Sequence, residues 1–192
     1  MQSTIIKHIK NYVSPTAVDL QLFTSGLNEI TVGKGVFLLK PGTYVQHEYF
    51  VTKGCLKAYY MDDKGKKHII QFAIENWWIG DFDAFNNQGT SKLYIEAIED
   101  SQLLSIKYDY LQNIYREAPI FERYFRLLAT NAFISQGKRV LSAQEKNTQE
   151  RYLEFCSSYP NIEHRIPNYD IANYLGVTPE NLSRIRSKLN IS

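Results

Sequence analysis

The chain has 192 residues and a formal net charge of +2, and 44% of its residues are hydrophobic. This length allows one large domain or two small domains with hydrophobic cores, and the hydrophobic content excludes a disordered chain. The small net charge excludes a general polyanion binder, so nucleic-acid recognition would need locally clustered positive charge. The N-terminal segment has no long apolar run, which predicts neither a signal peptide nor a membrane span and therefore a cytoplasmic protein.

Apolar residues at helical spacing predict helices in the first thirty residues, with a break at Ser14–Pro15. From about residue 30 to residue 106, short segments rich in Val, Ile, Tyr and Phe alternate with glycine turns. The sequence DKGK at residues 63–66 predicts a hairpin turn, and KPG at residues 40–42 predicts another turn. Several short strands at this spacing predict a sandwich or an antiparallel barrel.

After residue 108 the apolar period becomes helical, and Pro119 opens a long segment that we expect to be helical to about Ser142. Such a helix is roughly 35 Å long at about 1.5 Å per residue, and residues 136–138 (QGK) are the expected bend. An amphipathic helix of this length supplies either a dimer seam or a cover for the barrel, and the pattern fits both. The apolar stripe that we expect at the dimer interface consists of Phe121, Phe125, Leu128 and Ala132.

Residues 144–147 form a polar hinge, and Thr148 is placed to cap a helix that reaches Ser157. Further along, Ile171 and Leu175 are spaced to share one face of a short helix. Gly176 follows, where a left-handed backbone conformation would end that helix without steric cost.

A second helix is predicted directly after this turn. Thr178 suits its N-cap, Pro179 its first position, and Glu180 its first turn, where negative charge is favourable. Leu182 and Ile185 fall on the inner face, while an outer face carries polar and basic residues that suit groove reading. Together the two helices predict a helix-turn-helix that reads DNA, although an ordinary helical hairpin contains each of these elements singly. The expected DNA-binding residues are Thr178, Pro179, Glu180, Ser183, Arg184, Ser187 and Lys188.

These segments together resemble the Crp–Fnr family of bacterial regulators. The resemblance is most specific in the run from Gly42 to Gly54, the hairpin at Gly65, the segment 78–81 (WIGD) and the helix-turn-helix. Residues 150–186 are similar to the members found in Bacteroidetes-type bacteria. The resemblance implies an α+β fold with three parts. They are a jelly-roll, cyclic-nucleotide-binding-like sensor domain (1–118), a dimerisation helix (119–143) and a helix-turn-helix domain (144–192).

The sensor pocket implied by the resemblance departs from that of members that bind cyclic nucleotides. Their phosphate cassette begins Gly-Glu and supplies an Arg eleven positions after the Gly, and here Gly80 and Asp81 fit its start. Ser91 stands in the Arg position, and Lys92 comes next. A shift by one residue turns a strand side chain to the opposite face, and Lys lacks the fork that binds phosphate bidentately. With Phe82, these residues form the expected pocket, and we expect either a small molecule other than cyclic AMP or no effector.

Aromatic residues at the rim of this pocket suit an apolar ligand, although packing in the core accounts for them equally simply. They are Trp77, Trp78, Phe82 and Phe85. We expect no cofactor and no metal. His47 and Glu48 are the only pair that hints at a metal site, and they lack a companion histidine. No Ser-His-Asp or Cys-His arrangement indicates an enzyme, and Cys55 and Cys156 are expected to be free thiols.

Position by position, Glu180 and Arg184 match the acid and the arginine with which the family reads bases. A further family arginine is replaced here by Pro179, which has no donor. Family members continue into a two-stranded wing, so in this chain the wing is either absent or lost by truncation. Losing the wing's phosphate contacts would weaken DNA binding regardless of sequence.

The sequence therefore predicts a dimeric regulator that binds a pseudo-palindromic DNA site, with one recognition helix per half-site. The partners that the resemblance implies are double-stranded DNA, a second copy of the chain and RNA polymerase. The alternative is a ligand-sensing module that acts on a partner protein and carries a vestigial DNA-binding domain. The low net charge and the missing wing favour that alternative.

Overall fold

The computed structural model describes residues 2–159 and 162–189. Two helices, α1 (Gln2–Lys10) and α2 (Ala17–Ser25), precede the sheets. The strands are β1 (Leu27–Val32), β2 (Phe37–Leu39), β3 (His47–Lys53), β4 (Leu56–Met61), β5 (Lys67–Ala73), β6 (Trp78–Ile79), β7 (Tyr94–Ala97) and β8 (Ser101–Lys107), with α3 (Phe82–Asn86) after β6. Four α-helices and one short 3-10 helix follow: α4 (Tyr108–Glu117), α5 (Ile120–Glu145), α6 (Thr148–Ser158), η1 (Ile162–His164), α7 (Asn168–Leu175) and α8 (Pro179–Lys188).

The strands form two four-stranded sheets, with the orders β1-β8-β3-β6 and β2-β7-β4-β5. Every strand pair is antiparallel, which confirms the predicted antiparallel barrel or sandwich. The β4–β5 hairpin turns where the sequence predicts it. Gly65 has a φ of 74°, and the Asp62 carboxylate accepts hydrogen bonds from the backbone N–H groups of Lys64 and Lys66. An Asp side chain bonded to its own turn stabilises the hairpin locally.

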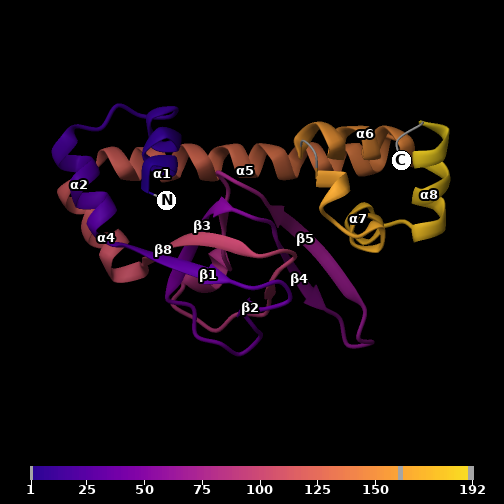
Figure 1. The fold of residues 1–192 in the computed structure, drawn as a ribbon, viewed down its shortest axis with the longest axis horizontal. Coiled ribbons are helices and arrows are strands. Elements are labelled where there is room, and N and C mark those ends of the chain that lie inside the picture. Colours follow the sequence, from indigo (N-terminus) through magenta and orange to yellow (C-terminus); the bar gives the residue numbers. More distant parts are fainter. Residues whose placement is uncertain (1, 160–161, 190–192) are drawn as a thin grey trace.

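Helices α1 and α2 lie at the end of α5 next to α4 (Figure 1) and pack their apolar side chains into the same core. Ile5 and Ile9 are fully buried, and the ring of Phe23 stacks on that of Phe121 with 4.5 Å between centroids. The break predicted at Ser14–Pro15 precedes a capping box, in which Thr16 and Asp19 satisfy each other's backbone N–H groups at the start of α2. The N-terminal helices therefore complete the barrel's core rather than forming a separate unit.

Helix α5 has 26 residues and runs without interruption past the bend expected at residues 136–138. Gly137 is exposed, and an exposed glycine in a helix costs about 1 kcal/mol but leaves the hydrogen-bond ladder intact. The next helix is capped by Asn147 in a capping box with Glu150, so the expected cap at Thr148 is wrong by one residue. Asn ranks above Thr as an N-cap, which explains the shift.

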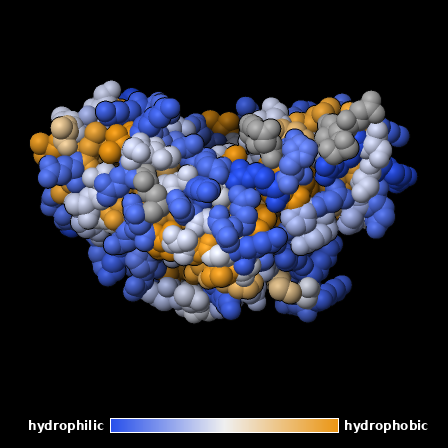
Figure 2. Space-filling view, in the orientation of Figure 1, coloured by the Kyte–Doolittle hydropathy of each residue, from blue (hydrophilic) through white to orange (hydrophobic). Residues whose placement is uncertain are grey.

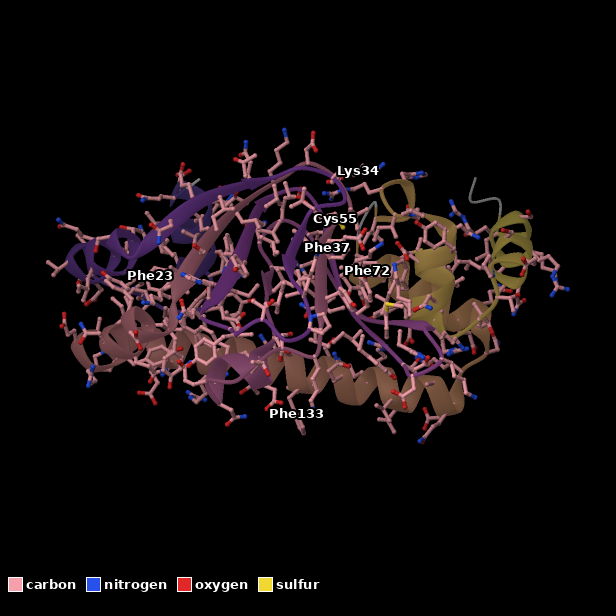
Figure 3. All side chains as sticks on the ribbon, turned by 90° about the horizontal axis from the view of Figure 1, so that it is seen from below. Phe23, Lys34, Phe37, Cys55, Phe72 and Phe133 are labelled. Atoms are coloured by element: carbon pink, nitrogen blue, oxygen red, sulfur yellow. The ribbon has the colours of Figure 1, made fainter. Side chains whose placement is uncertain are left out.

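The C-terminal helices, α6 to α8, lie at one end of the molecule, where α6 and α7 pack against the sheet that contains β4 and β5 and α8 packs on α7 (Figure 1). We call them, together with η1, the head. Phe72 of β5 points between the two parts, and its ring contacts Phe155 and Tyr159 edge-on (Figure 3). Trp77 stacks on Tyr159 with 5.1 Å between centroids. Barrel and head therefore share one continuous apolar cluster.

Polar groups reinforce this junction. The buried Lys57 ammonium of β4 lies 2.8 Å from Asp170 of α7 and 3.5 Å from Glu96 of β7. Burial by itself lowers the pKa of Lys57, but the hydrogen bond and the charge of Asp170 outweigh it, so this pKa is raised. Asn173 also joins the edge of β5, accepting from the backbone N–H of Ile69 and donating to the Lys67 carbonyl.

A second ionic contact lies beside the first. The Arg165 guanidinium contacts both Glu75 and Glu99 of the barrel, at 2.9 Å and 2.5 Å. The two carboxylates raise the pKa of Arg165 further above its ordinary value. Planar, bidentate geometry makes such Arg–carboxylate contacts directional, so they orient the head as well as attract it.

None of the helices in the described part of the chain combines the length and the apolar character that a bilayer crossing requires.

We predict that Lys57→Met destabilises the protein by roughly 3 kcal/mol, because it leaves Asp170 as a buried carboxylate without its cation. Replacing both partners, Lys57→Met with Asp170→Leu, should recover most of that loss. The free energy of unfolding in urea measures both effects. The control is Lys53→Met on exposed β3 surface, which removes the same charge and should change stability by less than about 0.5 kcal/mol. Equal effects at residues 53 and 57 would contradict the prediction.

Candidate nucleic-acid interface and sensor pocket

The turn between α7 and α8 has the geometry that its sequence predicts. Gly176 adopts φ 68° and ψ 33°, the left-handed conformation that ends α7. Thr178 is the N-cap of α8 and accepts from the backbone N–H of Asn181, and Pro179 opens the helix. Because Pro lacks an N–H that the first turn would leave unpaired, it suits this position. The turn therefore sets the angle between the two helices.

The inner faces of α7 and α8 pack together as the helical spacing predicts. Ile171 and Ala172 are fully buried, as is Leu182, while Leu175 and Ile185 are 7% and 8% exposed. Ala172 has the small side chain needed where helices cross closely. These contacts hold α8 by one face and leave the opposite face to solvent.

The opposite face of α8 carries the polar and basic residues expected to read DNA. Helix α8 lies at the end of the molecule remote from α4, and hydrophilic side chains cover its outer edge (Figures 1 and 2). Hydrogen bonds from its own backbone N–H and from Thr178 lower the pKa of Glu180, so Glu180 is ionised at neutral pH. The predicted DNA-binding residues are all exposed: Thr178, Pro179, Glu180, Ser183, Arg184, Ser187 and Lys188.

Asn168, which sequence reasoning missed, joins the two helices from the start of α7. Its amide nitrogen lies 3.1 Å from the Pro179 carbonyl oxygen and 3.1 Å from the Ser183 hydroxyl. Its amide oxygen accepts from Arg186 at 3.4 Å. Asn168 thus orients one of the predicted DNA-binding side chains. An Asn at the start of a helix usually indicates a local cap, so the sequence does not predict contacts with residues 11 to 15 positions away.

The prediction about a wing concerns the chain after Leu189, and residues 190–192 lie outside the described residues.

Three of the four residues expected at a dimer interface pack within their own chain. Phe121 is fully buried in its own chain. Phe125 packs against Trp78, with 5.1 Å between ring centroids, and Leu128 packs on the same core. Ala132 is exposed and lines a cavity on the barrel side of α5. Helical periodicity identifies an apolar face, but it does not tell which partner covers that face.

A second apolar stripe on α5 has no cover in the described residues. Phe133 is 81% exposed and projects away from the sheets (Figure 3). Ile134, Val140 and Leu141 are also exposed, and the pairs 133/140 and 134/141 are each spaced by one heptad. Large apolar side chains in such a row indicate a protein–protein interface.

The residues of the expected phosphate cassette form hydrogen bonds with one another. Asp81 is buried and caps α3 by accepting from the backbone N–H of Ala84. It also accepts a 2.7 Å hydrogen bond from the hydroxyl of Ser91 and a 3.4 Å bond from the backbone N–H of Lys92. Phe82, by contrast, is 62% exposed. Because no cationic side chain takes part in these bonds, the cassette has no evident means to bind a phosphate.

Glu48 of β3 lies beside this cassette, and the sequence reading gave it no role there. Its carboxyl group is buried, and its Oε1 atom has no hydrogen-bond partner among the described residues. Burial, helped by the negative charge of Asp81, raises the pKa of Glu48 from 4.5 to about 8. An alternating pattern shows only that residue 48 faces inward, so the sequence could not reveal that an unpaired carboxyl occupies this place.

Comparison with known proteins shows which proteins this chain resembles. Residues 29–118 match the model of the cyclic nucleotide-binding domain. The chain is 26% identical over 175 residues to electron transport regulator A of Shewanella oneidensis and to the fumarate and nitrate reduction regulatory protein of Yersinia pestis. Each alignment covers 84% of this chain and 68% of the relative. The chain is therefore similar to regulators of the Crp–Fnr family. Its relatives are transcription regulators rather than enzymes.

Solved structures share the fold. FixK2 from Bradyrhizobium japonicum superposes with a TM-score of 0.72 at 19% identity, covering 85% of this chain and 84% of that one. The c-di-GMP-responsive global regulator CLP of Xanthomonas campestris also gives 0.72, at 14% identity, with 91% and 92% covered. Barrel, long helix and head are therefore arranged as in these two solved structures.

We predict that Glu48→Gln stabilises the protein increasingly as pH rises from about 4.5 to about 8. Over that range the unfolded chain has lost the Glu48 proton while the folded chain keeps it, so folded wild-type protein loses stability as pH rises. Gln stays neutral and avoids this penalty, on the order of 1.4 kcal/mol for each unit of pKa difference.

The measurement is the difference in unfolding free energy between variant and wild type at a series of pH values. Glu29→Gln, on exposed β1 surface, is the control for the same chemical change in solvent. A Glu48→Gln difference that is the same at pH 5 and pH 8 would contradict a buried carboxyl with a raised pKa.

Proposed function

We propose that this chain acts as a homodimeric transcription regulator that reads a pseudo-palindromic DNA site with one α8 helix per half-site. The observation that carries the proposal is the helix-turn-helix itself, whose inner face is fully packed and whose outer face is exposed, polar and basic. A helix held in this way fits the major groove of B-DNA. At promoters, RNA polymerase would be a further partner.

Two side chains on α8 are assigned to base reading. Arg184 has the planar donor fork that pairs with the O6 and N7 atoms of guanine. Glu180, ionised at neutral pH, accepts from the amino group of cytosine. Pro179 offers no donor, so the base pair at its position is unspecified or read otherwise. Thr178, Ser183, Ser187 and Lys188 are assigned to phosphate or base contacts.

The dimer seam is assigned to the exposed stripe of α5 formed by Phe133, Ile134, Val140 and Leu141. A two-fold axis along α5 would pair this stripe with its own copy, which is the usual geometry of a dimer helix. Pairing would also fix the distance between the two α8 helices, and hence the spacing of the half-sites.

The sensor is proposed not to respond to cyclic AMP. Ser91 replaces the arginine that the family uses for the cyclic phosphate, and its hydroxyl is bonded to Asp81. A phosphate placed there would meet a carboxylate instead of a guanidinium. The loss of such a pairing in a buried site costs several kcal/mol, on the order of a thousandfold in affinity.

We predict that Arg184→Ala weakens binding to the cognate site by roughly 1–3 kcal/mol per half-site, because a bidentate contact to guanine is lost. The cognate site is first selected from random DNA with the wild-type protein, and affinities are then measured by fluorescence anisotropy. Arg116→Ala on exposed α4 removes the same charge at the other end of the molecule and should leave affinity unchanged (Figure 1).

Unchanged discrimination between cognate and scrambled DNA in Arg184→Ala would contradict the assigned base contact. If no sequence is selected by the wild-type protein at all, the alternative of a ligand sensor that acts on a partner protein gains support.

We predict that Phe133→Glu shifts the dimer towards monomer and raises the dissociation constant at least about tenfold, because two carboxylates would face each other across an apolar seam. Analytical ultracentrifugation measures the shift. Val18→Glu is the matched control, since Val18 is 74% exposed on α2, away from the stripe. A dimer equally stable in Phe133→Glu and wild type would place the seam elsewhere.

A further inference from the structure

A cavity of about 690 Å³ lies between the barrel and the inner side of α5. The cavity differs from the cassette of Asp81 and Ser91 because the polar groups of the cassette are already hydrogen-bonded to each other. Its volume lies within the range of small-molecule sites. The lining side chains that matter most are Tyr12, Glu48, Trp78, Phe85, Tyr115 and Phe125.

Glu48 is the acidic recognition group of this cavity. The backbone of Gly80 makes room for it, because a Cβ atom at residue 80 would lie 2.2 Å from the Glu48 Oε2 atom. Any residue larger than glycine at position 80 would displace the carboxyl. Its Oε1 atom is buried without a hydrogen-bond partner in the described residues. A buried acceptor in this state is destabilising unless a ligand satisfies it.

The cationic and ionisable groups near the cavity do not compensate Glu48. Burial lowers the pKa of His8, so His8 is neutral at pH 7, and its ring bonds to the Tyr124 hydroxyl at 2.8 Å. Arg139 donates to the Ile70 carbonyl and lies over the ring of Tyr174. The charge that acts on Glu48 is that of Asp81, a second carboxylate.

The unpaired carboxyl group of Glu48 and the aromatic walls determine which kind of ligand the cavity favours. An anion beside Glu48 would meet its carboxyl group with that of Asp81 nearby, whereas the guanidinium of Arg139, which also lines the cavity, is held by the Ile70 carbonyl and the ring of Tyr174. A cationic nitrogen would supply the missing N–H donors to Glu48 and favour the ionised form of its carboxyl group. The aromatic walls favour such a ligand further, because rings attract a nearby ammonium group and bury an apolar body.

We propose that the cavity between the barrel and α5 binds a small organic cation, an amine or amidine on an apolar body, whose nitrogen pairs with the carboxyl group of Glu48. Such a ligand would be the effector of the proposed regulator, and its role as effector therefore depends on the proposed function. The binding site itself does not, because binding can be measured without DNA. Helix α5 lines the cavity with one face and carries the exposed stripe on another, so an occupant would touch the element assigned to the dimer.

The test uses the intrinsic fluorescence of the full chain, which has two tryptophans, Trp77 and Trp78, both lining the cavity. Three probes of one size are titrated at pH 7: phenethylammonium, neutral 2-phenylethanol and anionic 3-phenylpropionate. We expect a saturable change with the ammonium probe, at least about tenfold weaker binding of the alcohol, and no saturation with the carboxylate. Equal or tighter binding of the carboxylate or of the alcohol would overturn the proposal.

Substitution then assigns the contact. Glu48→Gln should weaken phenethylammonium binding at least tenfold and should reduce the preference over 2-phenylethanol, whereas the control Glu29→Gln should change neither. Unchanged binding in Glu48→Gln would show that the ligand nitrogen pairs elsewhere and would overturn the assigned contact with Glu48. If Glu48→Gln fails to fold, which far-ultraviolet circular dichroism detects, the ranking of the three probes on the wild-type chain still decides. Loss of DNA reading in Arg184→Ala leaves these titrations unaffected, so the two proposals fail separately.

Discussion

The junction between the barrel and the head is the constraint on which the arrangement of this molecule depends. Phe72 fills the apolar part of the junction, and Lys57 holds Asp170 in its buried part. A buried ion pair adds little net stability over an apolar pair, but it tolerates only a narrow range of positions. The aromatic cluster therefore supplies attraction between barrel and head, while Lys57, Arg165 and Asn173 set their orientation.

Because α7 is held against β5, the direction of α8 follows from the junction. The turn at Gly176 and the bridge of Asn168 transmit the position of α7 to the recognition helix with little freedom. Any change that separates α7 from the sheet would reorient α8. The same contacts that stabilise the fold thus determine where the reading face points, and a population shift between docked and undocked heads would change DNA binding.

The barrel holds the expected ligand site, away from the junction with the head. Its cassette is closed by the Asp81–Ser91 hydrogen bond, and the unpaired carboxyl of Glu48 lies next to it. The barrel thus matches the cyclic nucleotide-binding domain in sequence, whereas the residues of its cassette bond to one another. Fold and ligand chemistry are separate properties, so the fold of the barrel does not by itself fix what it binds.

The sequence by itself determined the elements that depend on near neighbours. The helix-turn-helix, its left-handed glycine and its N-cap were predictable because they involve residues within a few positions of each other. The antiparallel strands and the β4–β5 hairpin followed from alternation and turn residues in the same way. Only the tertiary structure decided what covers each apolar face: the stripe of Phe121 and Phe125 faces the barrel, and that of Phe133 faces solvent. It also decided the pairing of Lys57 with Asp170, 113 positions apart, and the isolation of Glu48, because such pairings depend on the path of the whole chain and leave no local pattern.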